Sequence, residues 1–354
     1  MTTPETSRTI TFGVDTFGSL TREPDGSRTS QAQTLRDIAA EGQAADRAGV
    51  DVFSVGEHHR PDYAVSAPGI VLAGLATSTE RIRLGSAVVV LSSDDPVRVG
   101  ERFSSVQAMS GGRAEITVGR GSFIESFPLF GLSLDDYEVL FEEKLDLLAK
   151  ILQEDRVTWS GTTRGPLKDQ RIEPALEQPL PAWVAVGGSP ASVVRAAQHR
   201  MNLMLAIIGG PTERFVPYVN LFHEANEQLG HGRLPVGLHS PGHIAETDEQ
   251  ARAEVEQGWL RHRNQIGRER GWGPAGTEEF LGEIEHGALY VGSPETVARK
   301  IAHTLRVTGA DRFDLKYDTG TESHAAQKRA IELYGAEVIP RVRELLAEGD
   351  GAEA

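Results

Sequence analysis

The side chains best suited to acid–base chemistry gather in one short stretch, residues 57–63, which reads EHHRPDY. The stretch directly follows an apolar run, residues 52–55, that is typical of a strand buried on both faces. In folds built from parallel strands, the working residues lie at the carboxyl ends of the strands. Imidazole changes charge near neutral pH, so the pair His58 and His59 is a candidate proton-handling site. The alternative is that one histidine is a satisfied structural group and the other is solvated.

Two further segments carry residues suited to binding an anion. Arg120 stands between Gly119 and Gly121, so the backbone can approach a ligand closely while the guanidinium offers a planar fork that suits phosphate. Ser189 and Ser192 lie at an expected helix start, where free amide groups and the helix dipole attract negative charge. Together these residues could hold one phosphate. Alternatively, the glycines only form a turn and the serines only cap the helix.

The elements that must position these residues alternate between strand-like and helix-like patterns along the whole chain. The expected strands are 10–17, 51–55, 82–91, 114–118, 183–186, 201–208, 236–245 and 313–317. Eight strands alternating with helices predict a (β/α)₈ TIM barrel, with a doubly wound sheet as the alternative. We expect a single domain over residues 1–354, with insertions near 155–180 and 246–288 and a frayed tail at 348–354. The last helix is expected over 325–346, with an interruption at Pro340.

Composition excludes several classes of function. The chain of 354 residues carries a net charge of −15, which argues against nucleic acid and anionic membranes as partners. It has no cysteine, which excludes disulfides, thiolate chemistry and cysteine-bound metal centres. No apolar run approaches the ~18 residues needed to span a bilayer. We therefore expect a cytoplasmic protein.

Other motifs in the sequence do not support a function. Residues 271–276 read GWGPAG and match a dinucleotide-binding pattern, but they follow a polar helical segment instead of a strand and include Pro274. His239 and His243 are four residues apart in a strand-like segment, where helical metal-ligand spacing does not apply. We expect both to be surface histidines and predict no metal site. A glycine-flanked nucleophilic serine is also absent from the sequence.

Four segments, taken in order, resemble the bacterial luciferase-like flavin monooxygenases in sequence, spacing and placement at strand ends. They are 57–68, 85–98, 109–113 and 119–121. Residues 130–131 and 332–340 also look like that family. The resemblance covers most of the chain and implies a luciferase-like barrel that binds FMN at the carboxyl ends of its strands.

By motif position, the resemblance assigns a role to each candidate residue. His58 matches the catalytic histidine, with Glu57 and His59 as neighbours that orient it or are structural. The residues implied in cofactor binding are Ala87, Val88, Arg120, Gly121, Ser189 and Ser192. Arg120 and the two serines match the phosphate-binding groups, and the bond between Ala87 and Val88 falls where the family has a non-prolyl cis peptide against the flavin ring.

The resemblance implies that reduced FMN and O₂ oxygenate a small organic substrate, such as an aldehyde, alkane or sulfonate. The flavin carries the chemistry and the protein positions it in a site closed to water. Phe123, Phe127 and Leu129 could supply an apolar lining; the alternative is ordinary packing. With an ordinary pKa near 6.5, His58 would deprotonate flavin or substrate near neutral pH.

Two alternatives remain at this point. Relatives on this barrel carry out deazaflavin-dependent hydride transfer, and a non-catalytic flavin-binding protein would retain the same pocket. The sequence shows no nicotinamide signature, so a separate flavin reductase is expected to supply reduced FMN. We also expect a homodimer.

Overall fold

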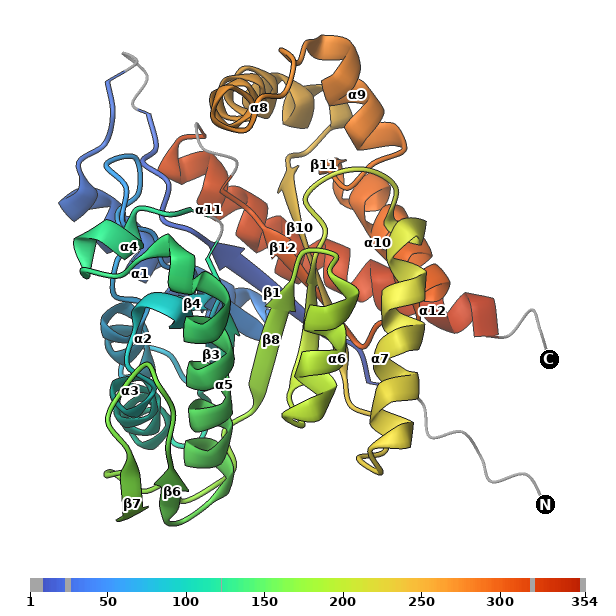
Figure 1. The fold of residues 1–354 in the computed structure, drawn as a ribbon. Coiled ribbons are helices and arrows are strands. Elements are labelled where there is room, and N and C mark those ends of the chain that lie inside the picture. Colours follow the sequence, from blue (N-terminus) through green and yellow to red (C-terminus); the bar gives the residue numbers. More distant parts are fainter. Residues whose placement is uncertain (1–8, 23–26, 122, 319–321, 351–354) are drawn as a thin grey trace, which may run out of the picture.

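A computed structural model describes residues 9–22, 27–121, 123–318 and 322–350 of the chain. A central sheet of parallel strands is surrounded by helices (Figure 1). Its strands are β1 (Thr11–Thr16), β2 (Val52–Val55), β3 (Arg83–Ser86), β4 (Val89–Val90), β5 (Ile116–Gly119), β8 (Ala182–Val186), β9 (Asn202–Ala206), β10 (Val236–Ile244), β11 (Tyr290–Gly292) and β12 (Arg312–Lys316).

The strand order shows that the sheet closes into a barrel. From one end the order is β3, β2, β1, β12, β10, β9, β8, β5 and β4, with β11 paired to the outer end of β10. β3 and β4 are two halves of one stretch, separated by a cis peptide bond between Ala87 and Val88. β4 pairs with β5, and a parallel bridge joins Leu84 of β3 to Ala114 just before β5. The prediction of an eight-position (β/α)₈ barrel is confirmed, and the doubly wound alternative is wrong.

The helices follow the strands around the barrel. They are α1 (Gln31–Ala48), α2 (Pro68–Ala76), α3 (Pro96–Met109), α4 (Ser126–Leu129), α5 (Tyr137–Gln153), α6 (Pro190–Gln198), α7 (Val216–Gln228), α8 (Asp248–Arg270), α9 (Thr277–Glu285), α10 (Pro294–Thr308), α11 (His324–Leu333) and α12 (Ile339–Asp350). Local chemistry fixes many of their ends. The Ser30 side chain accepts a hydrogen bond from the Gln33 amide, and Gly49 ends α1 with a φ of 83° that favours glycine.

The two expected insertions contain regular secondary structure, and the end of the chain differs from the sequence-based expectation. The segment 155–180 contains an antiparallel hairpin of β6 (Val157–Trp159) and β7 (Leu167–Gln170), and the segment 246–288 contains α8 and α9. The interruption of the last helix is a π-helical turn, Tyr334–Val338, which precedes Pro340. α12 extends through Asp350, so residues 348–350 of the expected frayed tail are helical, and 351–354 lie outside the described residues.

A buried ionic cluster fills the amino-terminal end of the barrel. The guanidinium of Arg312 donates two hydrogen bonds of 2.7 Å to the carboxylate of Asp314 and also pairs with Glu115. Glu115 also forms an ion pair of 2.8 Å with Arg83. Buried charges are retained only when they are paired, and these four side chains fill this end of the barrel. Space for a ligand therefore lies at the opposite, carboxyl-terminal mouth.

Within the described residues, none of the helices combines the length and apolar character needed to traverse a lipid bilayer.

Candidate active site

His58 lies among three aromatic rings at the mouth of the barrel. Its ring centroid is 4.9 Å from that of Phe17, which follows β1, 4.3 Å from that of Tyr63 and 5.2 Å from that of Phe123. Its Nε2 atom is buried and has no hydrogen-bond partner among the protein groups. A buried polar atom without a partner costs free energy, so its presence points to a ligand that supplies the missing hydrogen bond.

The surroundings of His58 change its expected protonation. Burial, followed by the positive charge of Lys316, lowers its pKa to about 3. The expectation of an ordinary pKa near 6.5 is therefore wrong for this structure. Because a lowered histidine pKa favours the uncharged form, the imidazole is neutral throughout the physiological range. His58 can accept or donate one hydrogen bond there, but it carries no positive charge.

We expect the His58 ring resonance not to titrate between roughly pH 5 and pH 8. Two-dimensional proton–carbon NMR of the histidine rings would measure this, with His58→Ala identifying the resonance. A titration midpoint near 6.5 would show that the ring is solvated instead of enclosed by the three aromatic side chains.

Glu57 and His59 support the site without facing the same aromatic enclosure. Glu57 is buried; its carboxylate is 2.9 Å from His59 Nε2 and accepts a hydrogen bond of 3.1 Å from the Val90 amide. The Glu57 amide donates to the Val88 carbonyl at 3.1 Å. These contacts tie the loop after β2 to the cis peptide segment between Ala87 and Val88. The geometry therefore favours the structural alternative for Glu57 and His59, because these contacts join the loop to the β4 segment.

Arg60 fastens three segments together above His58. Its guanidinium lies 2.7 Å from Glu125 before α4, 3.0 Å from Glu269 on α8 and 3.2 Å from Asp62. The same group lies over the Phe123 ring, 4.4 Å from its centroid. We call these residues the Arg60 clasp. It holds Phe123 and the end of α8 against the loop that carries His58.

The predicted anion-binding residues converge at a second part of the mouth. Arg120 Nη1 lies 2.6 Å from Glu138, and the buried Nε atom of Arg120 has no hydrogen-bond partner. Glu138 is also 3.9 Å from Arg195, which lies 3.3 Å from the hydroxyl of Ser192. Ser189 occupies the N-cap position of α6, yet its side chain makes no capping hydrogen bond. The cluster thus contains a guanidinium nitrogen and a hydroxyl available to a ligand.

Arg195 was missed by the sequence reasoning. It pairs with Glu142 at 2.6 Å and lies three residues after Ser192, so both side chains share one face of α6. The spacing of three residues between Ser192 and Arg195 was the feature of the sequence that could have identified Arg195. Gly121, predicted as a cofactor-binding residue, has a φ of 80°, and an added Cβ there would lie 2.8 Å from Val90. No larger side chain fits between Arg120 and β4.

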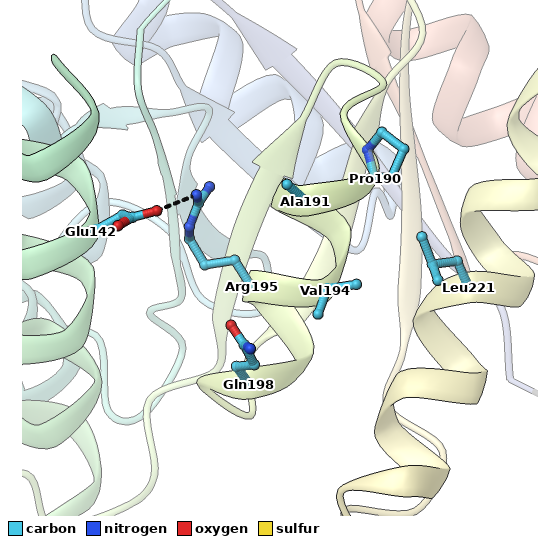
Figure 2. A pocket seen from close by; sticks show the side chains of 7 residues that line it. All are labelled: Glu142, Pro190, Ala191, Val194, Arg195, Gln198 and Leu221. Carbon is cyan, nitrogen blue, oxygen red and sulfur yellow. Dashed lines mark hydrogen bonds and ion pairs between the residues drawn. The ribbon is translucent and has the colours of Figure 1, made fainter.

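Two hollows in the structure do not coincide with the His58 enclosure. One, of about 460 Å³, lies on the surface between α5, α6 and α7, and Figure 2 shows the pair Arg195 and Glu142 along its edge. It adjoins the anion-binding cluster from outside. The other, of about 780 Å³, lies beside the β6–β7 hairpin and the segment 175–182 that leads into β8. Neither is lined by the rings around His58, so neither is identified with the active site.

Several other predicted residues fall elsewhere. Phe127 is buried and stacks on Tyr137 with 5.6 Å between ring centroids, which is packing beneath Arg120. Leu129 is 62% exposed and lies at the surface. Of the three proposed lining residues, only Phe123 contacts the His58 ring.

No group of three or more possible metal-ligating side chains occurs in the part of the chain that the structure describes.

The expectation that His239 and His243 are surface histidines is wrong. His243 is fully buried and lies 2.6 Å from Glu254. His239 is buried, with Nδ1 2.8 Å from Asp15, and its ring stacks on Phe17 with 5.7 Å between centroids. Burial alone would lower the pKa of His239, but the carboxylate of Asp15 outweighs it and the pKa is raised. The rings of His239 and His58 both contact Phe17, and their pKa values are shifted in opposite directions.

The chain is similar to known proteins at the levels of family, sequence and structure. Residues 16–312 match the family described as luciferase-like monooxygenase. A 4-hydroxyprotoasukamycin monooxygenase of Streptomyces nodosus subsp. asukaensis is 28% identical over 317 residues, covering 84% of each chain. A limonene 1,2-monooxygenase of Rhodococcus erythropolis is 26% identical over 303 residues, covering 83% of this chain and 78% of that protein.

Three solved structures share the fold. Monooxygenase RslO1 from Streptomyces bottropensis has a TM-score of 0.80 at 22% identity, covering 94% of this chain and 99% of that one. The oxygenating constituent of 3,6-diketocamphane monooxygenase from Pseudomonas putida, in complex with FMN, has a TM-score of 0.77 at 16% identity. The likeness covers 94% of this chain and 98% of that one. A coenzyme F420-dependent tetrahydromethanopterin reductase from Methanopyrus kandleri has a TM-score of 0.71 at 17% identity, and the likeness covers 94% of this chain and 99% of that one.

Proposed function

Because this chain belongs to the luciferase-like monooxygenase family, we propose that it uses reduced FMN and O₂ to oxygenate a small organic substrate at the mouth of its barrel. One observation carries the proposal: a cluster suited to phosphate and an enclosed imidazole with an unsatisfied nitrogen occur at the carboxyl ends of strands in the same barrel. The cluster contains Arg120, Arg195 and Ser192, and the imidazole is that of His58. A molecule with a phosphate tail and a reactive ring matches both parts.

The residues present fit FMN. Arg120 and Arg195 would hold the phosphate together with the hydroxyls of Ser189 and Ser192 at the start of α6. Both arginines are now paired with Glu138 and Glu142, whose side chains are 62% and 55% exposed. Such exposed ion pairs are weak, so a phosphate carrying up to two negative charges can displace the carboxylates. Gly121 leaves room for the close approach.

The cis segment Ala87–Val88 and His58 lie where the flavin ring is proposed to bind. When bound, the reduced flavin supplies the electrons that activate O₂. The chain's own residues then have three tasks. His58 offers its neutral Nε2 for one hydrogen bond, the rings of Phe17 and Phe123 exclude water from it, and Glu57 fixes the β4 segment through the Val90 amide. One oxygen atom would enter the substrate and the other would leave as water.

A deazaflavin-dependent hydride transfer is the second candidate. It is favoured by the structural likeness to a coenzyme F420-dependent reductase, although that likeness concerns the fold alone. FMN is preferred because both curated relatives above are named monooxygenases. A non-catalytic flavin-binding protein would have no need to keep His58 enclosed with an unsatisfied nitrogen.

The test is oxygen uptake with chemically reduced FMN and a panel of aldehydes, ketones, alkanes and alkanesulfonates, using ¹⁸O₂. The proposal expects one labelled oxygen atom in the product and one in water. Transfer of hydride from reduced deazaflavin without oxygen uptake would instead establish the second candidate. A separate flavin reductase, a homodimer and a cytoplasmic location complete the proposal.

Breaking the Arg60 clasp should admit water to the site. We expect Arg60→Met to raise the share of reduced FMN whose oxidation yields free hydrogen peroxide by roughly two- to fivefold, because loosening Phe123 and α8 opens the enclosure. A peroxide assay with total oxygen uptake measures this share.

Arg263→Met is the matched control for that prediction. Arg263 also lies on α8 and pairs with a glutamate, Glu279, at 2.9 Å, but on the side of the helix that faces α9. Equal peroxide release from both variants would mean that the Arg60 clasp does not protect the site.

A further inference from the structure

One face of α8 runs as a continuous stripe from the protein core to the barrel mouth. Successive steps of four and three residues place its members on one side of the helix. The stripe consists of Ala251, Val255, Gly258, His262, Gln265 and Glu269. Figure 1 shows α8 above the carboxyl ends of the strands. A helix in that place forms a roof over the site.

The stripe is anchored on both sides of His262. Before it, Val255 is fully buried and Gly258 is buried. After it, the Gln265 side chain donates to Asp62 at 3.4 Å, and Glu269 lies 3.0 Å from Arg60 of the clasp. His262 is therefore held on the same face, directed at the segment that carries His58.

On this stripe His262 and Glu269 are exposed, although the same face is anchored at Gly258, Gln265 and Glu269. Because the anchored face is turned toward the loop that carries His58, the exposed part of His262 borders open space on that side of the helix. The surrounding protein nevertheless lowers the pKa of His262, as expected for a group that faces a hollow instead of the outer surface. The contacts of Gln265 with Asp62 and of Glu269 with Arg60 place His262 over the loop that carries His58, and the same four charged groups, Lys316, Asp318, Asp62 and Arg60, act on the pKa of both imidazoles.

The chemistry of this region favours an uncharged substrate. Its walls near His58 are the rings of Phe17, Tyr63 and Phe123. The two cations that influence both imidazoles are already neutralised: Lys316 lies 2.6 Å from Asp318, and Arg60 is surrounded by three carboxylates. A carboxylate or sulfonate would find no free positive partner in them. A hydroxyl or carbonyl oxygen, in contrast, can pair with an imidazole.

We propose that His262 is a substrate-contacting residue, whose imidazole hydrogen-bonds the oxygen of a neutral substrate with an otherwise apolar body. This inference rests on the proposed oxygenase function and names its substrate class. His262 acts from the roof, while His58 acts from the barrel below. The contact should select for ketones, aldehydes or alcohols over alkanes of equal length and over alkanesulfonates.

Protection from a histidine reagent tests the placement without any turnover. Diethyl pyrocarbonate modifies accessible neutral imidazoles, and peptide mass mapping gives the rate at each histidine. We expect 2-decanone, added with oxidised FMN or alone, to slow modification of His262 at least about fivefold when its site is saturated. His286, at the end of α9 with a side chain 78% exposed, is the control and should react at an unchanged rate. Unchanged modification of His262 would overturn the placement.

Kinetics with three ten-carbon probes test the role of the contact. With reduced FMN, His262→Ala should raise KM for 2-decanone by about tenfold, the equivalent of one lost hydrogen bond, and leave decane nearly unaffected. His262→Gln retains a donor and should stay within about threefold of the parent. Decane-1-sulfonate should be the poorest substrate. An unchanged KM for 2-decanone in His262→Ala, or efficient use of the sulfonate, would overturn the inference.

The experiments distinguish a failure of this inference from a failure of the proposed oxygenase function. If 2-decanone protects His262 but the parent protein oxygenates no probe, the placement of His262 holds and the proposed oxygenase function fails. If the parent oxygenates decane and 2-decanone equally and His262 is not protected, the oxygenase function holds and this inference fails. FMN affinity should be the same in His262→Ala and in the parent.

Discussion

His58→Ala should bind FMN with nearly the parent affinity and yet lose turnover by about 10²–10⁴-fold. The loss follows from the enclosure of the ring, which leaves Nε2 buried and without a partner. A group held there with its pKa lowered to about 3 is neutral, so it can hydrogen-bond the reacting molecules at neutral pH. Stopped-flow oxidation of reduced FMN with product analysis would measure the loss, and FMN fluorescence would measure the affinity.

A second variant separates chemistry from packing. His58→Phe keeps a ring among Phe17, Tyr63 and Phe123 but removes both nitrogens, so it should lose turnover as severely as alanine while retaining more thermal stability. His286→Ala, at the exposed end of α9, should behave as the parent. Normal turnover in His58→Phe with saturating reduced FMN would remove His58 from the mechanism.

Arg120→Ala should weaken FMN binding by about 10- to 100-fold, which corresponds to the loss of one or two charge-assisted hydrogen bonds. Riboflavin, which lacks the phosphate, should bind the variant and the parent almost equally. Turnover at saturating reduced FMN should change much less than affinity. Isothermal titration with each flavin would measure the difference between the two ligands.

Glu138→Ala is the matched control for the phosphate assignment. Glu138 now occupies the guanidinium of Arg120 at 2.6 Å, so removing the carboxylate should leave FMN affinity unchanged or raise it. If Arg120→Ala weakened FMN and riboflavin by the same factor, Arg120 would be supporting the barrel and not the phosphate.

Much of the fold could be predicted from local signals. Ser30 and Gly49 bound α1, and Pro68 opens α2, because capping and proline chemistry act within a few residues. The convergence of Arg120 with Ser192 could also be predicted, since carboxyl ends of parallel strands meet at one edge of a barrel. The cis peptide between Ala87 and Val88 came only from the family resemblance.

The electrostatics of the site could not be predicted in the same way. The lowered pKa of His58 depends on Phe17, Phe123 and Lys316, which come from three distant parts of the chain. The Arg60 clasp joins residues 209 positions apart, from Arg60 to Glu269. Local patterns contain no information on such contacts, so neither the neutral imidazole nor the clasp was expected.

His239 was expected at the surface although it lies in a segment predicted to be a strand. That strand is confirmed, since β10 runs through Ile244. Pairing with β9 ends at His239, whereas Pro241 is in register with Lys316 of β12. A proline is tolerated where one neighbouring strand has already ended, because its missing amide leaves no hydrogen bond unmade on that side. The histidine before it therefore stays inside the barrel, next to Asp15.

The most direct test of the central claim is a crystal structure of the protein with bound FMN. The account predicts electron density for the phosphate between Arg120, Ser189 and Ser192, and for the ring beside the Ala87–Val88 segment within reach of His58. Density for the phosphate at the start of α10, or for the ring in the surface hollow beside α7, would contradict it.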